Sequence, residues 1–331
     1  MPKAISPPLV HSFAAPRNRV RRLVLNVALS VATLVVLVAV FEGGARLLGP
    51  VGYLMVPSAG NCMERDPLLG YRLRPSCTGY LHHTALRTNA LGLRGPDVPD
   101  DDGRPRILAL GDSCTFGWQV QESESYPALL EERLSTDGRR PFRVLNAGVP
   151  GYTTHQGLHV LRERAPALRP EIVTIAFGFN DAARDGDLES QLAALRASAR
   201  FLRLDDWLMT HSRFYQRLRH GLEEPTDAGA SRPPRIPLDR YAANLTSLVT
   251  LAREHGAKPV LVSFWPEPMF TEEPAETSVY REAVANVGRE LDVPAVTYKG
   301  PKMDLVHPTA EGYHWLVTDL VEALDGAGYT R

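Results

Sequence analysis

The strongest hydrophobic signal in the chain is an uncharged run from Leu23 to Phe41. As an α-helix rising about 1.5 Å per residue, it comes close to the roughly 30 Å hydrocarbon core of a bilayer. Four arginines precede it within residues 17–22, whereas only Glu42 and Arg46 follow closely. The positive-inside rule therefore predicts a single-pass membrane protein, with a cytoplasmic N-terminus and an extracytoplasmic (periplasmic or extracellular) remainder.

A cleaved signal peptide is the alternative for this segment. Its apolar region would be shorter, about 7–15 residues, although Gly43-Gly44-Ala45 offers the small residues of a cleavage site. We prefer an uncleaved anchor over residues 23–41 because the apolar run is long. Residues 1–22 contain Pro and Arg without apolar periodicity, so we expect a short disordered cytoplasmic tail.

From Arg106 onward, short apolar runs alternate with segments of helical periodicity. The runs are ILAL (107–110), RVLNAGV (143–149), EIVTIAFG (171–178), PVLVSFW (259–265) and AVTY (295–298). Strands that alternate with helices favour a parallel sheet covered on both faces. Because crossover connections are right-handed, we expect residues 105–328 to form a flavodoxin-like three-layer α/β/α sandwich around a five-stranded parallel sheet.

Two regions depart from this alternation. Residues 43–104 are rich in Gly, Pro and turn signals, and we expect short extended segments and loops packed on the catalytic domain. Residues 185–237 form an insertion with a helical first part and a Pro/Gly-rich second part, 221–237, expected to be a mobile loop. The helical part, which includes Trp207 and Met209, is interpreted as a packing helix, with a lid or a membrane-facing patch as alternatives.

Composition narrows the function classes. The chain has 37 basic and 38 acidic residues, a net charge of −1, and its arginines are scattered among acids. A basic groove and a nucleic-acid partner are therefore not expected. The cysteines, Cys62, Cys77 and Cys114, form no zinc-type motif. A Cys62–Cys77 disulfide would close a loop of about 15 residues and would matter only in an oxidising compartment.

Candidate chemistry collects where the predicted strands end, which is where ligands bind in open α/β sheets. Ser113, Gly148 and Asn180 follow the first three strands, and Asp304 and His307 precede the last helical segment. A serine hydroxyl needs a base. His307 is the candidate, oriented by Asp304 three residues earlier on one helical turn. The N–H groups of Ser113 and Gly148 and the Asn180 amide are the expected oxyanion donors.

Other polar residues near these positions have structural interpretations. Asp112 and Asp181 are expected to hold loops through hydrogen bonds to the backbone. Cys114 is expected to pack in the core. Helix capping is the structural alternative to catalysis for Ser113 and Asn180.

Four blocks of sequence resemble, in order, the diagnostic blocks of the SGNH/GDSL-type serine hydrolases. They are GDSCTFG (111–117), NAGVPGY (146–152), GFND (178–181) and DLVHP (304–308), within a resemblance that covers roughly residues 105–325. The resemblance implies a Ser113 nucleophile, an oxyanion hole with Gly148 and Asn180, and a triad completed by Asp304 and His307. It also implies ester hydrolysis without metal or organic cofactor.

Two further segments, DPLLGYRLRP (66–75) and RTNALGLRG (87–95), resemble extensions of membrane-anchored members of that family and have no assigned role. Together these features predict a membrane-anchored esterase acting on acylated small molecules, lipids or glycans. Acyl transfer to an extracytoplasmic glycan is an alternative if water is excluded. A non-catalytic binding module on the same fold is another, disfavoured by the intact Ser/His/Asp set.

Overall fold

The computed structural model describes residues 17–48, 59–82, 84–99, 102–136, 140–184, 186–197, 199–222, 232–264 and 275–330. The chain divides into two compact units, Met1–Gly49 and Pro50–Arg331. The first contains helix α1 (Arg17–Leu47), which extends beyond the predicted anchor at both ends and includes residues 43–47 of the expected accessory region. Its stretch Arg19–Leu47 is long and apolar enough to cross a membrane, a property that anchors and signal sequences share.

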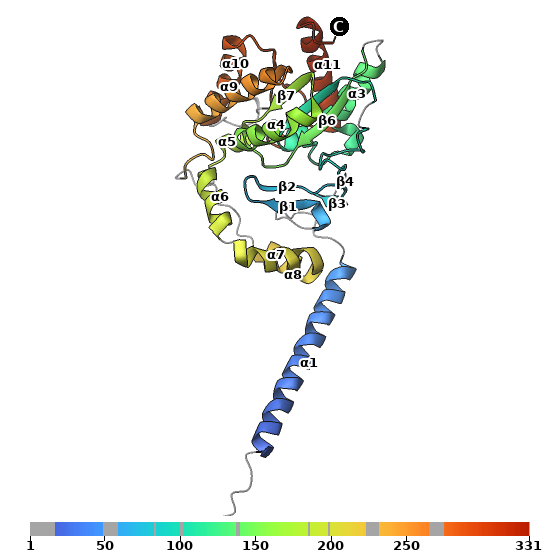
Figure 1. Ribbon diagram of the computed structural model, residues 1–331, viewed down its shortest axis with the longest axis vertical. Helices are drawn as coiled ribbons and strands as arrows, with labels where there is room; N and C mark the ends of the chain where they lie inside the picture. The colour runs from blue at the N-terminus through green and yellow to red at the C-terminus, as the bar shows by residue number, and fades with distance from the viewer. Residues whose placement is uncertain are drawn as a thin grey trace, which may run out of the picture. The chain divides into compact units, whose positions relative to one another are not determined.

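A five-stranded parallel sheet forms the centre of the second unit (Figure 1). Its strands are β5 (Arg106–Gly111), β6 (Arg143–Gly148), β7 (Ile172–Ala176), β8 (Lys258–Ser263) and β9 (Ala295–Thr297). They lie in the order β6-β5-β7-β8-β9, and all neighbours are parallel. Each strand overlaps the apolar run predicted for it, so the expected sheet is confirmed. The strand order reverses beside β5, and in open α/β sheets ligands bind at the carboxyl ends of the strands next to such a reversal.

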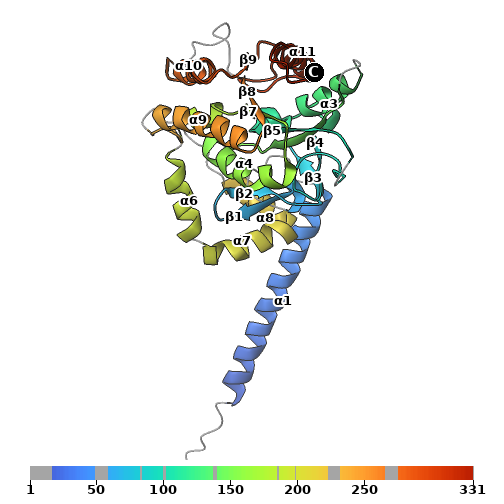
Figure 2. The same cartoon turned by 45° about the horizontal axis from the view of Figure 1, so that its top comes forward.

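Helices cover both faces of this sheet and give the three expected layers. Leu108 and Leu110 of β5 belong to a core shared with α4 (Thr154–Leu168), α9 (Leu238–Glu254) and α10 (Ala275–Glu290). Ile107 and Ala109 belong to a second core shared with α3 (Tyr126–Thr136) and α11 (Ala310–Gly326). Figure 2 shows α9 and α10 on one side of the strands and α3 and α11 on the other. Burial on both faces explains why the β5 run is apolar throughout.

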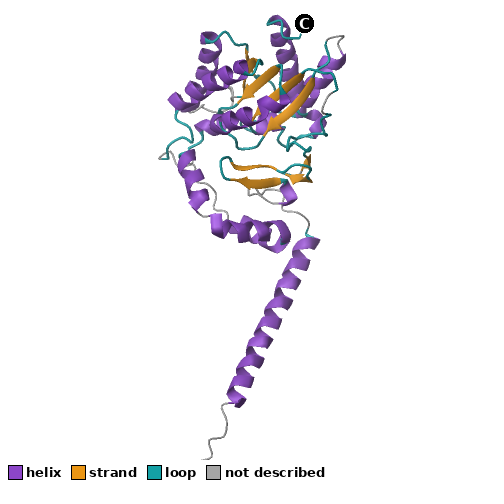
Figure 3. Cartoon of the chain, in the orientation of Figure 1, coloured by secondary structure: helices purple, strands orange, loops and turns teal. Residues whose placement is uncertain are grey.

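Two antiparallel hairpins form the accessory region. They are β1–β2 (Met63–Asp66, Gly70–Leu73) and β3–β4 (Thr78–Leu81, Thr84–Arg87). Figure 3 shows them as short strands separate from the parallel sheet. They follow a 3-10 turn, Ala59–Asn61, and a disulfide between Cys62 and Cys77 joins the residue before β1 to the residue before β3.

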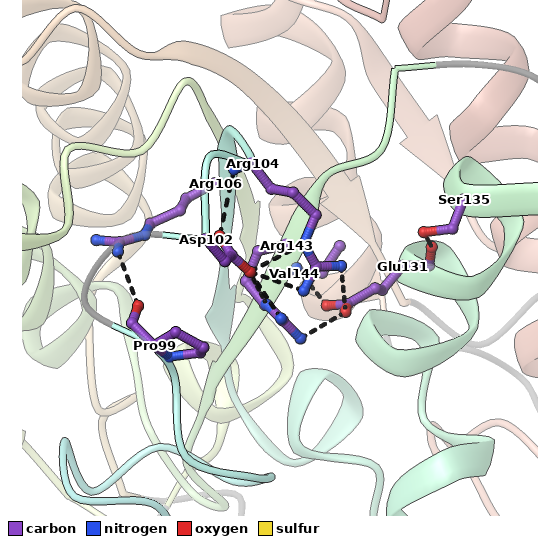
Figure 4. A network of polar contacts seen from close by, with 8 residues as sticks. All are labelled: Pro99, Asp102, Arg104, Arg106, Glu131, Ser135, Arg143 and Val144. Atoms are coloured by element: carbon purple, nitrogen blue, oxygen red, sulfur yellow. Dashed lines mark hydrogen bonds and ion pairs between the residues drawn. The ribbon is translucent and has the colours of Figure 1, made fainter.

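A charged network ties the end of the accessory region to the edge of the sheet (Figure 4). Arg143 on β6 donates to Asp102 Oδ2 at 2.7 Å and to Glu131 Oε1 at 2.8 Å. Arg104 bonds the same two carboxylates. Glu131 Oε2 also accepts the backbone N–H of Val144 at 2.8 Å. Because β6 is an outer strand, this carboxylate satisfies a donor that the sheet leaves unpaired.

The insertion is helical, with α6 (Leu188–Ala197), α7 (Ala199–His211) and α8 (Arg213–Leu222). Met209 is buried, as a packing helix requires, whereas Trp207 is 57% exposed. Of the expected mobile loop 221–237, residues 223–231 lie outside the described residues. Its end is packed on the domain, because the Ile236 side chain is buried and its N–H donates to the carbonyl oxygen of Asp181.

Candidate active site

Ser113, His307 and Asp304 meet in one chain of hydrogen bonds. Oγ of Ser113 lies 2.7 Å from Nε2 of His307, and Nδ1 of His307 lies 2.7 Å from Oδ2 of Asp304. Both distances are those of strong hydrogen bonds. When the Nδ1–H group donates to the carboxylate, Nε2 is left as the acceptor for the serine hydroxyl.

The turn after β5 places Ser113, the expected nucleophile, at the carboxyl edge of the sheet. Ser113 begins the short helix α2 (Ser113–Phe116) directly after β5, and Asp112 caps that helix by accepting the N–H of Cys114 at 2.9 Å. Gly111 has no room for a side chain, because a Cβ there would lie 2.1 Å from Oγ1 of Thr115. The GDSCTFG block thus encodes a tight strand-to-helix turn, and Asp112 holds it as expected.

Asp304 and His307 come together through a side-chain turn, and the expected helical turn is wrong. Oδ1 of Asp304 accepts the backbone N–H groups of Val306 at 3.0 Å and His307 at 2.9 Å. Aspartate favours such turns because its carboxylate reaches the backbone two or three residues ahead. The other carboxylate oxygen is then free to contact the His307 ring. Helix α11 begins only at Ala310, with Thr309 as its N-cap.

Burial and hydrogen bonding set the charges of this pair. Burial lowers the pKa of the His307 imidazole, and this effect outweighs the opposing influence of Asp304. Burial acts to raise the pKa of Asp304, but hydrogen bonds from His307 and Val306 bring it below its usual value. A neutral imidazole beside an ionised carboxylate is the state that a general base requires.

An indole ring covers the imidazole of His307. The ring of Trp118 stacks on that of His307, with centroids 5.7 Å apart and planes at 27°. His82, in the turn between β3 and β4, packs against the same indole with a centroid distance of 4.7 Å. The stacked Trp118 ring explains part of the burial of His307. Sequence analysis missed Trp118 because nothing in its context separates it from an ordinary core aromatic.

Gly148 and Asn180 lie on the same rim with their donors already engaged. The N–H of Gly148 donates to Oδ1 of Asn146 at 3.0 Å. Nδ2 of Asn180, in the short helix α5 (Phe179–Ala182), donates to Oδ2 of Asp112 at 3.1 Å and to the carbonyl oxygen of Tyr152 at 3.2 Å. These bonds hold both groups in place, and an oxyanion would have to share or displace them.

Glycine at position 148 allows β6 to approach the turn after β5. A Cβ there would lie 2.2 Å from the backbone nitrogen of Phe116. Any side chain would therefore force β6 and α2 apart. The glycine of the second block serves this close approach as well as any contact with substrate.

Two buried carboxylates lie behind the rim. Burial raises the pKa of Asp112 and of Asp181 to about 7. Asp181 accepts the N–H of Thr154 at 3.0 Å and its hydroxyl at 2.5 Å, which connects α5 to α4. Both aspartates thus bond to backbone groups, in agreement with their expected structural roles.

Cys114 is buried, and burial raises the pKa of its thiol. It is a packing residue, as expected. Among the residues that the structure describes, no group of three or more His, Cys, Asp or Glu side chains is arranged to hold a metal ion.

Arg94 is a second residue that sequence analysis missed. It lies in the RTNALGLRG segment, to which no role was assigned, and its side chain is buried against the end of α2. A lone arginine in a polar loop resembles a surface cation in sequence, so no local pattern could have identified it.

Comparison with known proteins places the chain in a family. Residues 109–315 match the sequence model of the GDSL-like Lipase/Acylhydrolase family. An arylesterase of Vibrio mimicus is 35% identical over 79 residues, which cover 24% of this chain and 39% of that protein. Esterase TesA of Pseudomonas aeruginosa is 35% identical over 101 residues, which cover 28% of this chain and 48% of that protein.

This chain therefore spans less than half the length of these curated relatives. Among solved structures, the crystal structure of TesA aligns with a TM-score of 0.46 and 20% identity, over 67% of this chain and 98% of that one. The family match covers more than half of the chain and most of the α/β domain. This protein belongs to the GDSL-like lipase/acylhydrolase family.

Proposed function

We propose that this protein is a serine ester hydrolase in which Ser113 is the nucleophile, His307 the general base and Asp304 the residue that orients the imidazole. The observation that carries the proposal is the 2.7 Å contact between Ser113 Oγ and His307 Nε2, continued to Asp304 by a second hydrogen bond. Membership of the acylhydrolase family supports the reaction class.

The proposed reaction has two halves. Nε2 of His307 takes the hydroxyl proton while Oγ of Ser113 bonds to the ester carbonyl carbon, and the imidazolium then gives that proton to the departing alcohol. A water molecule, deprotonated by the same Nε2, attacks the acyl-enzyme, and the imidazolium returns this proton to Oγ of Ser113 as the carboxylic acid is released. Asp304 stabilises the imidazolium in each half and fixes its tautomer.

Developing negative charge on the carbonyl oxygen needs donors that are already in place. We assign this role to the N–H groups of Ser113 and Gly148 and to the amide of Asn180. The support for this assignment is their position at the ends of β5, β6 and β7. Asn146 and Asp112 hold the last two donors in position, and the oxyanion must share or displace these bonds when it forms.

We infer that α1 anchors the catalytic unit, with the N-terminus in the cytoplasm, because arginines cluster before its apolar part and not after it. The Cys62–Cys77 disulfide supports an oxidising, extracytoplasmic compartment for the catalytic unit. Acyl esters of envelope lipids or glycans are the substrates that this location favours. The mass of the purified protein tests the anchor, since cleavage after residue 45 would remove α1 almost completely.

The decisive assay uses the full chain in detergent with p-nitrophenyl esters of increasing acyl length. Ser113→Ala and His307→Ala should lower kcat/KM by about 10³-fold or more. Ser135→Ala, which removes an exposed hydroxyl on α3, is the matched control and should be fully active. Equal hydrolysis by all four proteins would reject the assignment. Release of free acid without an added acceptor would favour hydrolysis over acyl transfer.

A further inference from the structure

We propose that Arg94 of the accessory region is a positioning residue of the active site. It holds the helix that begins with Ser113 at a fixed position relative to the N–H group of Gly148. The proposal rests on the proposed role of Ser113. Arg94 is only 3% exposed, and it lies before residues 109–315, the part of the chain that matches the family.

The guanidinium of Arg94 bonds the end of the nucleophile helix. Nη1 donates to the carbonyl oxygens of Phe116 at 2.6 Å and Gly117 at 2.7 Å, and Nη2 donates to that of Val120 at 2.8 Å. The same group lies over the Phe116 ring, 4.4 Å from its centroid. The last carbonyls of a helix lack intrahelical partners, and a cation there opposes the negative end of the helix dipole.

The backbone of Arg94 connects this contact to the opposite side of the site. Its N–H donates to the carbonyl oxygen of Asn146 on β6 at 3.1 Å. The Asn146 side chain then donates to the carbonyl oxygen of Phe116 at 3.1 Å and accepts the N–H of Gly148 at 3.0 Å. Arg94 and Asn146 therefore hold both the helix that begins with Ser113 and the N–H group assigned to the oxyanion.

A buried cation is costly unless hydrogen bonds replace its lost hydration. Burial lowers the pKa of Arg94 to about 10, and its Nε has no hydrogen-bond partner among the residues that the structure describes. An apolar side chain would fill the same space without this cost. Arginine is therefore favoured at this position for its three hydrogen bonds to carbonyl oxygens. Neither lysine nor a neutral residue has the forked guanidinium that makes them.

A tight loop presents Arg94 at this position. Oδ1 of Asn89 accepts the N–H groups of Leu91 and Leu93, both at 3.0 Å. Gly92 has a φ of +72°, and a Cβ there would lie 2.8 Å from the carbonyl oxygen of Leu73. Residues 89–94 (NALGLR) thus form a tight loop that fixes the position of the Arg94 guanidinium.

Loss of the guanidinium should move the end of α2 and with it the hydroxyl of Ser113. A misplacement of about 1 Å can cost about 10²-fold in rate. We expect Arg94→Met to lower kcat by about 10- to 100-fold, with little change in KM for a small ester, because Arg94 bonds backbone groups and not substrate. Arg94→Lys should remain impaired, since a single nitrogen does not reproduce the spacing of Nη1 and Nη2 between the carbonyls.

The experiment compares the full-length wild type with Arg94→Met, Arg94→Lys and Arg94→Ala in detergent, using p-nitrophenyl acetate and fluorophosphonate labelling. Arg87→Met is the matched control, because Arg87 lies in the same segment but makes a surface ion pair with Glu122. Guanidinium chloride at millimolar concentration should raise kcat of Arg94→Ala several-fold, and urea should not. Arg94 is among the residues that line a pocket of about 410 Å³, and we expect the ion to enter from this side.

The outcomes separate this proposal from the proposed function. An inactive wild type would reject the esterase assignment itself. An active wild type with unchanged kcat in the Arg94 variants would overturn the positioning role alone. A lower kcat that follows only the folded fraction, without rescue by guanidinium, would show that Arg94 supports folding and not the geometry of the site.

Discussion

The hydroxyl group of Tyr313 donates a 2.8 Å hydrogen bond to the carbonyl oxygen of Cys114. Tyr313 is fully buried in α11, the helix that follows His307, and Cys114 is the residue after Ser113. This contact connects the segment carrying the proposed base to the turn carrying the proposed nucleophile. Tyr313→Phe should therefore lower the free energy of unfolding by about 1–2 kcal/mol and also reduce kcat by about 3- to 10-fold.

Tyr280→Phe is the matched control for this prediction. Its buried hydroxyl also donates to a carbonyl oxygen at 2.8 Å, but that oxygen belongs to Ile236, which lies in neither the Ser113 turn nor the His307 segment. Thermal unfolding and steady-state kinetics of both variants separate the two effects. Similar kinetic losses in both would show that the Tyr313 bond has no special link to the site.

The contact between Trp118 and His307 predicts a pH effect. Trp118→Ala admits water to the imidazole, so the pKa of His307 should rise from its lowered value toward the ordinary one of about 6.5. Because the neutral imidazole is the active form, the acid limb of the kcat/KM profile should move to higher pH. Trp207→Ala, which removes an exposed indole, should leave that limb in place. An acid limb that stays or moves downward in Trp118→Ala would refute this explanation.

The sheet and the convergence of the triad were predictable because both depend on local patterns. Ile107, Leu108, Ala109 and Leu110 are contiguous in sequence, and such a run has one favourable place in an α/β protein, the buried sheet. Parallel strands then bring their carboxyl ends to one edge, so Ser113 and Gly148 had to be neighbours.

What sequence analysis missed depends on contacts between distant segments. The i, i+3 spacing of Asp304 and His307 fits a helical turn and a side-chain turn equally well, and only the backbone bonds to Asp304 decide between them. The accessory strands have four residues each, and the sequence indicates short extended segments there without marking which strands pair, β1 with β2 and β3 with β4. Arg94 and Trp118 act on groups more than 20 and more than 180 residues away, respectively.

The position of the Asn180 amide, hydrogen-bonded to Asp112 and to the Tyr152 carbonyl oxygen, leads to a prediction about kcat. Asn180→Ala removes one assigned oxyanion donor, and kcat should fall by about 10²- to 10³-fold while KM changes little. Asn244→Ala, which removes an amide bonded to Thr154 on α4, is the control and should keep kcat within a few-fold. Single-turnover kinetics with a p-nitrophenyl ester test the acylation step directly. A loss confined to KM would assign Asn180 to substrate binding instead.

The raised pKa of Asp181 predicts how the free energy of unfolding depends on pH. Its folded-state pKa is about 7, against about 3.9 in the unfolded chain. Between these values the folded protein binds a proton that the unfolded chain has lost, so the free energy of unfolding falls as pH rises. Asp181→Asn retains an oxygen acceptor for Thr154 and cannot ionise, so its stability should fall less between pH 5 and 8.

Denaturant unfolding of the full chain at these two pH values measures the difference. Asp319→Asn, on the exposed face of α11, is the control and should behave as the wild type. Asp112 is also buried with a raised pKa, so we expect some pH dependence to persist in Asp181→Asn. An unchanged difference in stability between the two pH values would contradict the assignment to Asp181.

The most direct test of the account is to locate the covalent adduct of a fluorophosphonate by peptide mass spectrometry, in the wild type and in His307→Ala. A hydroxyl activated by the neighbouring imidazole should carry the phosphonyl group, so the wild type should be modified on Ser113 and the variant should react at least about 10³-fold more slowly. An adduct on another residue, or equal labelling of Ser113 in both proteins, would contradict the proposed proton relay.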